Sequence, residues 1–352
     1  MTSNKKVLLI TDQHFGVRND NQVFIEKYRE FYSTIVLPYI RKHKIDTVLC
    51  LGDTFDKRKS INFLSLESAR EMWFDPLREM GIQMYMLIGN HDIYYKNTLK
   101  INAPQHLLSG YDNIRIIDEP QHIEINGKKI LMLPWICDDN REKTNILIEQ
   151  SDATVCLGHL ELTGFEAIPG RFMEAGDDPS PYDKFDLVCS GHYHHKSKKG
   201  NINYLGNPNQ IYWNDYGLNR GFHILNTDTL RLQFHKNPYT IFNKLYYDDV
   251  QKDYETLPDF ERLRGSYVKV IVQQRTNQVW FDRYIKSLQD INVADLKIIE
   301  DLTLVLDDVD ESLETEDTMT ILETYVQDLE DSIDKTSVVT ILKSLYTEAL
   351  NL

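Results

Sequence analysis

The 352-residue chain has no long hydrophobic run and few cysteines. No apolar stretch approaches the roughly 18 residues that a membrane-spanning helix needs, so we expect no membrane segment. The first residues, MTSNKKVLLIT, contain only a four-residue apolar run, well short of the hydrophobic core of a signal peptide. The four cysteines are scattered, and three lie inside apolar runs, which is typical of buried free thiols. We therefore expect no disulfides and a reducing, cytoplasmic location.

Internal repeats are also absent, and the only strongly biased segment is the acidic stretch DDVDESLETED at 307–317. The net charge of −15 would by itself disfavour a polyanionic partner, but its distribution matters more. Residues 301–352 carry 14 acidic and 2 basic side chains, whereas the other 300 residues have a net charge of only −3. A nucleic-acid partner for the main body is therefore not excluded. The acidic segment itself is either a solvated tail or an interaction arm.

Short apolar runs alternate with amphipathic stretches along the first two thirds of the chain. Buried strands are predicted at 6–11, 46–53, 82–90, 153–159 and 185–194. Helices are predicted over about 22–43 and 62–80. Hairpins are predicted at 221–234 and at 122–135, where Asn126-Gly127 favours a tight two-residue turn. This alternation indicates an α/β unit with a sheet at its centre.

A change of composition near 235–245 divides the chain into unequal parts. We expect a first domain over 1–238 and a small α+β capping domain over 239–306, with strands at 267–274 and 296–305 and a helix at 278–290. Residues 307–352 are expected to form an acidic linker and a C-terminal arm of two amphipathic helices.

Each predicted strand of the first domain ends in residue types that bind metal ions. The five segments are Asp12-Gln13-His14, Gly52-Asp53-Thr54-Phe55-Asp56, Gly89-Asn90-His91-Asp92, Gly158-His159 and Gly191-His192-Tyr193-His194. In extended backbone, residues i and i+2 point the same way, so Asp12 and His14 are expected to address one point, as are His192 and His194. Taken alone, most of these segments are better explained as a polar loop, a turn or a structural histidine, and Gly-Asn-His-Asp is the most specific of them. Five of them in one order indicate a metal centre.

The order of these motifs resembles that of the calcineurin-like metallophosphoesterases, D-x-H, GDxxD, GNH(D/E), GH and GHxH. The resemblance covers about 190 residues and implies a two-sheet α/β sandwich with a dinuclear metal site at the strand ends. Carried over by position, it implies one ion held by Asp12, His14 and His194. It implies a second held by Asn90, His159 and His192, with Asp53 bridging both. Mixed imidazole and carboxylate ligands favour transition metals over Ca²⁺, and we expect two Mn²⁺, with Mg²⁺ or other divalent ions as alternatives.

Asn90 has a physical rationale in such a site. A neutral amide oxygen completes the coordination sphere without cancelling the surplus positive charge that attracts a phosphodiester anion. The resemblance also implies hydrolysis by direct attack of hydroxide, with His91 stabilising the transition state or protonating the leaving oxygen. Asp56 is expected to orient the His91 imidazole, the alternative being an ordinary loop carboxylate. His195 is expected to face away from the ligands.

A closer resemblance is to the SbcD-type nuclease subunits, particularly their bacteriophage recombination-endonuclease branch. It rests on DQHFGVR (12–18), LGDTFDKRKSI (51–61), IGNHDIYYKN (88–97), LPWICDDN (133–140), GHLELTGF (158–165), SGHYHH (190–195) and YLGNPNQ (204–210). It covers nearly the full chain and implies a 3′ to 5′ exonuclease on double-stranded DNA and an endonuclease on single strands, acting in double-strand-break processing and recombination. Many cellular members have His at the position of Asp56, which leaves the role of that residue open.

Several cations and aromatic residues follow the ligand loops. Arg18, Lys57, Arg58 and Lys59 are predicted to hold a DNA backbone, with solvated side chains as the alternative. Tyr94 and Tyr95 either stack on bases or pack against the protein.

The resemblance further implies protein partners. The C-terminal helices are expected to dock on a coiled-coil ABC-type ATPase of the SbcC type, because amphipathic terminal helices need a surface to cover their apolar faces. Packing on the body of the same chain is the alternative. A homodimer is also implied, and the helix around 62–77 is a candidate surface unless its apolar residues belong to the core. Those residues are Phe63, Leu64, Leu66, Trp73 and Phe74.

Two other functions stay open on sequence grounds. One is a phosphatase or small-molecule phosphodiesterase that uses the same site. The other is a catalytically inactive scaffold, which the intact ligand set disfavours. Activity on a DNA duplex compared with p-nitrophenyl phosphate and cyclic nucleotides discriminates these alternatives.

Overall fold

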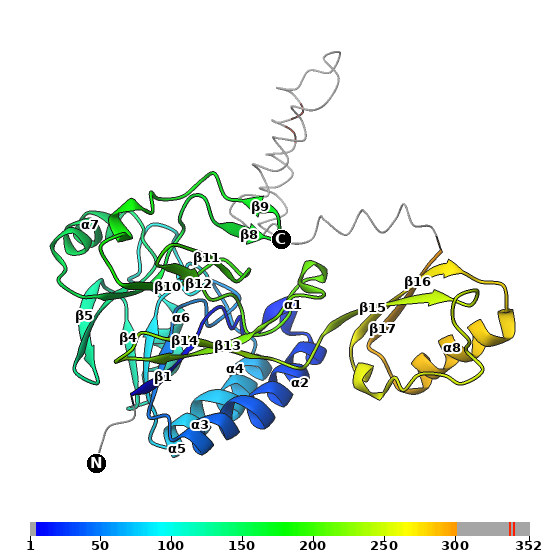
Figure 1. Cartoon of the computed structure of the whole chain (residues 1–352). Coiled ribbons are helices and arrows are strands. Elements are labelled where there is room, and N and C mark those ends of the chain that lie inside the picture. The colour runs from blue at the N-terminus through cyan, green and yellow to red at the C-terminus, as the bar shows by residue number, and fades with distance from the viewer. Residues whose placement is uncertain (1–4, 301–337, 339–340, 342–352) are drawn as a thin grey trace.

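The structure is a computed structural model that describes residues 5–300 together with Val338 and Ile341 (Figure 1). The predicted acidic linker and terminal helices, and the last residues of the strand predicted at 296–305, lie outside the described residues apart from those two positions. The predicted boundaries at 238 and 306 stay predictions.

Two six-stranded sheets form the body of the molecule. The first has the order β14-β13-β1-β2-β3-β4. Its strands β1 to β4 are parallel, and β13 and β14 add an antiparallel edge. The strands are β1 (Lys6–Ile10), β2 (Thr47–Cys50), β3 (Gln83–Leu87), β4 (Ile114–Ile117), β13 (Gly221–Asn226) and β14 (Leu232–Lys236).

The second sheet has the order β11-β12-β10-β7-β6-β5. Its central strands β12, β10, β7 and β6 are parallel, and both edge strands are antiparallel. The strands are β5 (Gln121–Ile125), β6 (Lys128–Leu133), β7 (Val155–His159), β10 (Leu187–Gly191), β11 (Ser197–Lys199) and β12 (Ile202–Tyr204).

Alternating side chains hold the two sheets together. In β1, Val7 and Leu9 belong to the layer between the sheets, whereas Leu8 and Ile10 pack against the helices. The inner layer combines such residues with their counterparts from the second sheet, for example Val155 and Leu157 of β7, so both sheets bury one face against the other. The two-sheet α/β sandwich predicted from the sequence is confirmed.

Helices cover the outer faces of both sheets. On the first sheet these are α2 (Gln22–Phe31), α3 (Leu37–His43), α4 (Phe63–Ala69), α5 (Asp75–Glu79) and α6 (Ala103–Leu108), and on the second α7 (Arg141–Gln150). The continuous helices predicted at 22–43 and 62–80 are each interrupted by a π-helical turn, at Tyr32–Val36 and Arg70–Phe74. Pro38 and Pro76 are each the second residue of the α-helix that follows the turn. Because proline cannot donate to the preceding turn, a widened turn accommodates it.

A third sheet of three parallel strands lies beside the body (Figure 1). Residues 242–299, called the capping unit below, contain β15 (Phe242–Asp248), β16 (Tyr267–Gln274), α8 (Gln278–Asp290) and β17 (Asp295–Ile299), with a core of their own. At its base, Phe242 and Tyr267 stack on each other, and both rings lie about 6 Å from the ring of Phe24 in α2.

Several short elements were not predicted from the sequence. They include α1 (Val17–Asp20), α6, β4, β11, β12, β15 and the hairpin formed by β8 (Glu166–Ile168) and β9 (Arg171–Phe172). The longer helix α7 was not predicted either. None of the described helices is both long and apolar enough to cross a membrane. All four cysteines are buried and unpaired.

Candidate metal centre

The loops that follow five parallel strands meet at one edge of the sandwich. Because β1, β2 and β3 are parallel in one sheet, and β7 and β10 in the other, the residues after their carboxyl ends come together. The two loop sets are also bonded directly, since the backbone N–H of His192 donates to both carboxylate oxygens of Asp12, at 3.0 and 3.2 Å. The structure thus brings together all the predicted ligands, which are Asp12, His14, Asp53, Asn90, His159, His192 and His194.

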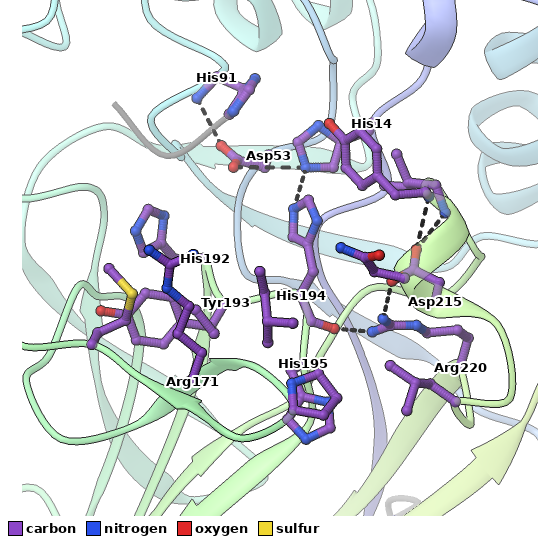
Figure 2. Close-up of a pocket in the computed structure, with 18 of the residues that line it drawn as sticks. His14, Asp53, His91, Arg171, His192, Tyr193, His194, His195, Asp215 and Arg220 are labelled. Atoms are coloured by element: carbon purple, nitrogen blue, oxygen red, sulfur yellow. Dashed lines mark hydrogen bonds and ion pairs between the residues drawn. The ribbon is translucent and has the colours of Figure 1, made fainter. Parts of the chain in front are cut away.

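The first group of ligands consists of Asp12, His14 and His194. One potential ligand atom from each of these residues lies within 4.8 Å of the other two. The Nε2 atoms of His14 and His194 are 3.0 Å apart (Figure 2). Two imidazole nitrogens and a carboxylate at this spacing suit a single divalent transition-metal ion.

The second group consists of Asp53, His159 and His192, with Asn90 between the two histidines. The amide oxygen of Asn90 is 3.0 Å from Nε2 of His159 and 3.0 Å from Nδ1 of His192. Asp53 lies between the groups, because its Oδ2 is 3.3 Å from Nε2 of His159 and 3.9 Å from Nε2 of His14. Its carboxylate is therefore placed to bridge two ions.

The hydrogen bonds of His159 test whether a cation fits this group. Its Nδ1 is 2.7 Å from the carbonyl oxygen of Leu51, which can only accept, so Nδ1 carries the proton. In the neutral form that can bind a metal ion, the Nε2 lone pair of His159 faces the oxygens of Asn90 and Asp53. Three acceptors that converge on one point repel each other unless a cation lies between them. The donor set therefore fits a bound metal ion.

Charge is concentrated at the centre. Burial alone would raise the pKa of Asp53, but His159 and the neighbouring His91 hold it well below its usual range. For His14, burial alone would lower the pKa, because it disfavours the charged ring. The carboxylates of Asp56 and Asp53 instead raise the pKa of His14 to about 9. Burial also opposes protonation of His159, whose pKa the carboxylate of Asp53 raises to about 9. These buried carboxylates require positive charge, which divalent cations supply.

The backbone of the ligand loops is left-handed at several positions. Asp12, His14, Asp53 and His192 have φ values of 50°, 47°, 51° and 86°. Asp12 and His14 do face one point, as expected, but turns rather than strand alternation orient them, because β1 ends at Ile10. The expectation that His192 and His194 face one point was wrong, because they belong to different ligand groups. Left-handed conformations of this kind cost about 1–3 kcal/mol each and persist where the surroundings enforce them.

Glycine is required where the loops cross. A Cβ on Gly89 would lie 2.1 Å from Oδ1 of Asp53, and one on Gly52 would lie 2.5 Å from Nδ1 of His159. Only glycine therefore allows the strand ends to approach this closely.

Comparison with known proteins decides the family. Residues 5–196 match the family model of the calcineurin-like phosphoesterases, and the match includes all seven predicted ligands. The chain is a calcineurin-like phosphoesterase.

Three relatives extend this result. The phosphoesterase is 31% identical to exonuclease subunit 1 of Enterobacteria phage T4, over 98% of this chain and 99% of the relative. It is 27% identical to the DNA double-strand break repair protein Mre11 of Sulfurisphaera tokodaii, over 54% of this chain and 49% of the relative. It is 24% identical to the uncharacterized metallophosphoesterase YhaO of Bacillus subtilis, over 87% and 79%. The predicted resemblance to the phage branch of the SbcD-type nuclease subunits is confirmed.

His91 of the phosphoesterase lies at the edge of the two ligand groups. Its backbone N–H donates to Oδ1 of Asp53 at 2.8 Å, and its ring lies 4.8 Å from that of His14. Burial lowers the pKa of His91. Its Nδ1 is 2.7 Å from the backbone carbonyl oxygen of Asp56, an acceptor that places the proton on Nδ1 and leaves Nε2 for reacting groups.

Asp56 contacts both histidines, with different atoms. The predicted orienting contact to His91 comes from its backbone carbonyl oxygen rather than from its carboxylate. The carboxylate Oδ1 instead lies 3.3 Å from Nδ1 of the ligand His14. The sequence could not show that the backbone carbonyl of Asp56 contacts His91 while its carboxylate contacts His14, because the residue type does not indicate which backbone atoms form hydrogen bonds.

The four predicted DNA-binding cations lie outside the pocket at the centre. Arg18 donates from Nε to the carbonyl oxygen of Ile211 and lies 4.7 Å from the ring of Tyr212, which lines the pocket. Lys57 is 3.3 Å from a carboxylate oxygen of Asp20.

The other two cations lie further along the same loop. Arg58 is half-buried, and the exposed Lys59 lies 5.5 Å from the ring of Tyr94. Both Tyr94 and Tyr95 are exposed, which leaves their rings available for stacking.

His195 lines the same pocket but joins neither ligand group. Its Nε2 is 3.3 Å from a carboxylate oxygen of Glu166 in β8. Arg171 of β9 and Arg220 also line the pocket, and neither was predicted from the sequence.

Asp92 is a buried residue to which the sequence assigned no role. Its Oδ1 accepts from the backbone N–H groups of Thr54 and Phe55, and its Oδ2 accepts from that of Gly89. Asp92 therefore ties the loop after β2 to the loop after β3. Its position next to Asn90 and His91 in the third motif was the signal for this role.

Proposed function

We propose that this phosphoesterase is the nuclease subunit of a DNA-processing complex that uses two Mn²⁺. Its activities are a 3′ to 5′ exonuclease on double strands and an endonuclease on single strands, in break processing and recombination. The observation that carries the proposal is the nearly full-length similarity to a phage exonuclease subunit. The complete set of seven converging ligands supports an active enzyme rather than an inactive scaffold.

The ligand groups define where the ions would be held. Asp12, His14 and His194 would hold one, and Asn90, His159 and His192 the other, with Asp53 shared. Two bound cations supply hydroxide at neutral pH and attract the phosphodiester anion. Mn²⁺ suits this mixture of imidazole, carboxylate and amide ligands, and Mg²⁺ or another divalent ion is the alternative.

The chain's own residues orient and move protons around these ions. His91 presents Nε2, the nitrogen not engaged by the Asp56 carbonyl, to the reacting groups. This nitrogen accepts a proton from water or, once protonated, passes it to the leaving oxygen. Asn90 contributes no negative charge, so the centre keeps the positive potential that stabilises a pentavalent phosphorus.

Positive side chains around the centre would hold the rest of the DNA. Arg171 lies at the pocket itself, and Lys57, Arg58 and Lys59 follow the loop that carries Asp53. Contacts from such residues to phosphate oxygens position a duplex without reading its sequence. Arg18 acts there indirectly, by holding the pocket residue Tyr212.

We also propose two protein contacts. The helical arm at 307–352 would dock on a coiled-coil ABC-type ATPase, in the cytoplasm of a host cell. A homodimer would use the start of α4, where Phe63 and Leu64 are 87% and 52% exposed. Leu66, Trp73 and Phe74, predicted as further dimer residues, are buried in the core and are excluded from that surface.

The decisive experiment compares substrates on the purified full-length chain with Mn²⁺. We expect cutting of an end-labelled duplex from its 3′ ends and nicking of circular single strands, with stimulation by the ATPase subunit and ATP. His91→Ser should lose this activity while retaining metal binding. Turnover of p-nitrophenyl phosphate or cyclic nucleotides with no DNA cleavage would replace the proposal by a phosphatase or small-molecule phosphodiesterase. No Mn²⁺ binding in a titration would leave a scaffold.

A further inference from the structure

A series of buried polar side chains runs from the metal-ligand loop to the capping unit. Its members are Arg220, Asp215 and Gln210, which are 5%, 5% and 2% exposed. Burying charged groups costs free energy unless each is paired and hydrogen-bonded, so their partners indicate what they hold in place.

Arg220 connects to the metal centre through the backbone of His194. Its Nη1 donates to the carbonyl oxygen of His194, and its Nη2 donates to Oδ1 of Asp215 (Figure 2). The same carbonyl oxygen accepts from the backbone N–H of Asn207, at 3.3 Å. Because a guanidinium is planar and offers its donors in a fixed geometry, it sets the position of His194 relative to Asp215. That position determines how the His194 ring meets His14, 3.0 Å away.

Asp215 stabilises the turn at 211–215, most of whose residues line the pocket. Its second oxygen, Oδ2, accepts from the backbone N–H groups of Ile211 at 2.6 Å and Tyr212 at 3.1 Å. Its own carbonyl oxygen accepts from Nε2 of Gln210, at 2.9 Å. The carboxylate and the backbone of Asp215 therefore join Arg220 on one side to Gln210 on the other.

Gln210 completes the series at the base of the capping unit. Its Oε1 accepts from the backbone N–H groups of Ile241 at 2.7 Å and Phe242 at 2.8 Å. Phe242 is the first residue of β15, and its ring lies 4.8 Å from that of Trp213 in the same turn. The bonds from Arg220 to Asp215, from Gln210 to Asp215 and from β15 to Gln210 are buried, so this part of the series is shielded from water.

We propose that Arg220, Asp215 and Gln210 are positioning residues that hold His194 in its ligating orientation and couple it to the base of the capping unit. The proposal rests on the proposed function, because it concerns the same metal centre. Coupling between two places is reciprocal. Metal binding therefore stabilises the start of β15, and a displaced capping unit weakens metal binding.

The first test is a calorimetric Mn²⁺ titration of the full-length chain and of Arg220→Lys. Lysine keeps a positive charge beside the buried carboxylate of Asp215, which preserves the fold, but its single ammonium does not reproduce the two-pronged contact. We expect Mn²⁺ affinity to fall at least about 10-fold, as for other residues that orient metal ligands, with an unchanged circular dichroism spectrum. Arg70→Lys is the matched control. Arg70 also donates to a backbone carbonyl oxygen, that of Leu107, and its replacement should leave Mn²⁺ affinity unchanged.

The second test follows hydrogen exchange at the amides of Ile241 and Phe242, with and without Mn²⁺. We expect Mn²⁺ to slow exchange there in the wild-type chain and in Arg70→Lys. The response should be lost in Arg220→Lys and in Gln210→Leu, which removes both bonds to β15.

Wild-type Mn²⁺ affinity in Arg220→Lys would overturn the proposal. So would exchange at Ile241 and Phe242 that is indifferent to Mn²⁺ in the wild-type chain. These two outcomes would leave the proposed function intact. A wild-type chain that binds no Mn²⁺ would instead contradict both the proposed function and the positioning proposal.

Discussion

Asn90 is a residue whose chemical role could be predicted from the sequence, although the backbone conformation of the neighbouring ligand loops could not. Its role as a neutral ligand was implied by the family resemblance, and the structure puts its amide oxygen 3.0 Å from two histidine nitrogens. The left-handed backbone at Asp12 and His14 was not foreseen, because it depends on contacts between distant loops. Ligand types were therefore readable from the sequence, whereas the way the backbone aims them was not.

The neutrality of Asn90 leads to a prediction. In Asn90→Asp the new carboxylate would still bind a cation but would cancel the surplus positive charge of the centre. We expect Mn²⁺ affinity to be equal or higher and kcat/KM for a DNA phosphodiester to fall about 100-fold, a typical effect of weakened transition-state stabilisation. Calorimetry and steady-state kinetics measure the two quantities separately. Wild-type kcat/KM in the variant would show that the charge of this ligand is irrelevant.

His223 provides a pH dependence that is independent of the metals. Burial in β13, aided by Lys196, lowers its pKa to about 3. Between this value and the ordinary histidine pKa of about 6.5, only the unfolded chain takes up the proton, so stability falls as pH is lowered through this window. We expect a contribution of at most about 1.4 kcal/mol per pH unit, measured by urea unfolding at several pH values. His223→Leu should flatten the profile; an equally steep profile in that variant would assign the slope to other groups.

At the scale of elements, the strands that carry the ligands were predicted more accurately than the helices around them. Buried strands are marked by apolar runs, so β1, β2, β3, β7 and β10 all lie within their predicted ranges. The π-helical turns in the helices arise from Pro38 and Pro76 together with tight aromatic packing, such as that of Tyr32 on Trp73. The β8–β9 hairpin is too short to produce a periodic pattern.

Asp92 joins two of these elements and supports a second stability prediction. Asp92→Asn replaces one acceptor oxygen by an amide nitrogen, which cannot accept, so either Gly89 or the pair Thr54 and Phe55 loses its acceptor. An unsatisfied buried group costs about 1–3 kcal/mol, and we expect a loss of this size in urea unfolding. Mn²⁺ affinity should fall as well, because the loops of Asp53 and Asn90 lose their common anchor. A stable variant with reduced affinity would still support the anchor; unchanged values for both would contradict it.

The contact between α2 and the capping unit yields a second element-scale test. Phe24→Ala removes the ring that Phe242 and Tyr267 pack against. Large-to-small changes of this kind cost about 3–5 kcal/mol, so we expect faster proteolysis near residues 238–242. Tyr39→Ala, on the same helical layer but away from the capping unit, is the control. Equal cleavage rates in wild type and Phe24→Ala would show that other contacts hold the capping unit.

At the scale of the whole molecule, the net negative charge is concentrated in residues 301–352. The 300 residues outside 301–352 have a net charge of only −3, so acidity does not prevent the body from approaching DNA. Deletion of 307–352 should therefore preserve Mn²⁺ binding and Mn²⁺-dependent nicking of single strands, and should abolish stimulation by the ATPase. Pull-down with the ATPase subunit and a nicking assay measure these outcomes. ATPase stimulation that survives the deletion would place the docking surface elsewhere.

The burial of Cys50, Cys137, Cys156 and Cys189 gives the native chain a practical property. Maleimide dyes reach surface thiols far faster than buried ones. One cysteine introduced at the exposed Val279 of the capping unit and another at the exposed Ile146 of α7 would thus accept a fluorophore pair without prior removal of native thiols. Single-molecule energy transfer between them would report any swing of the capping unit during a catalytic cycle.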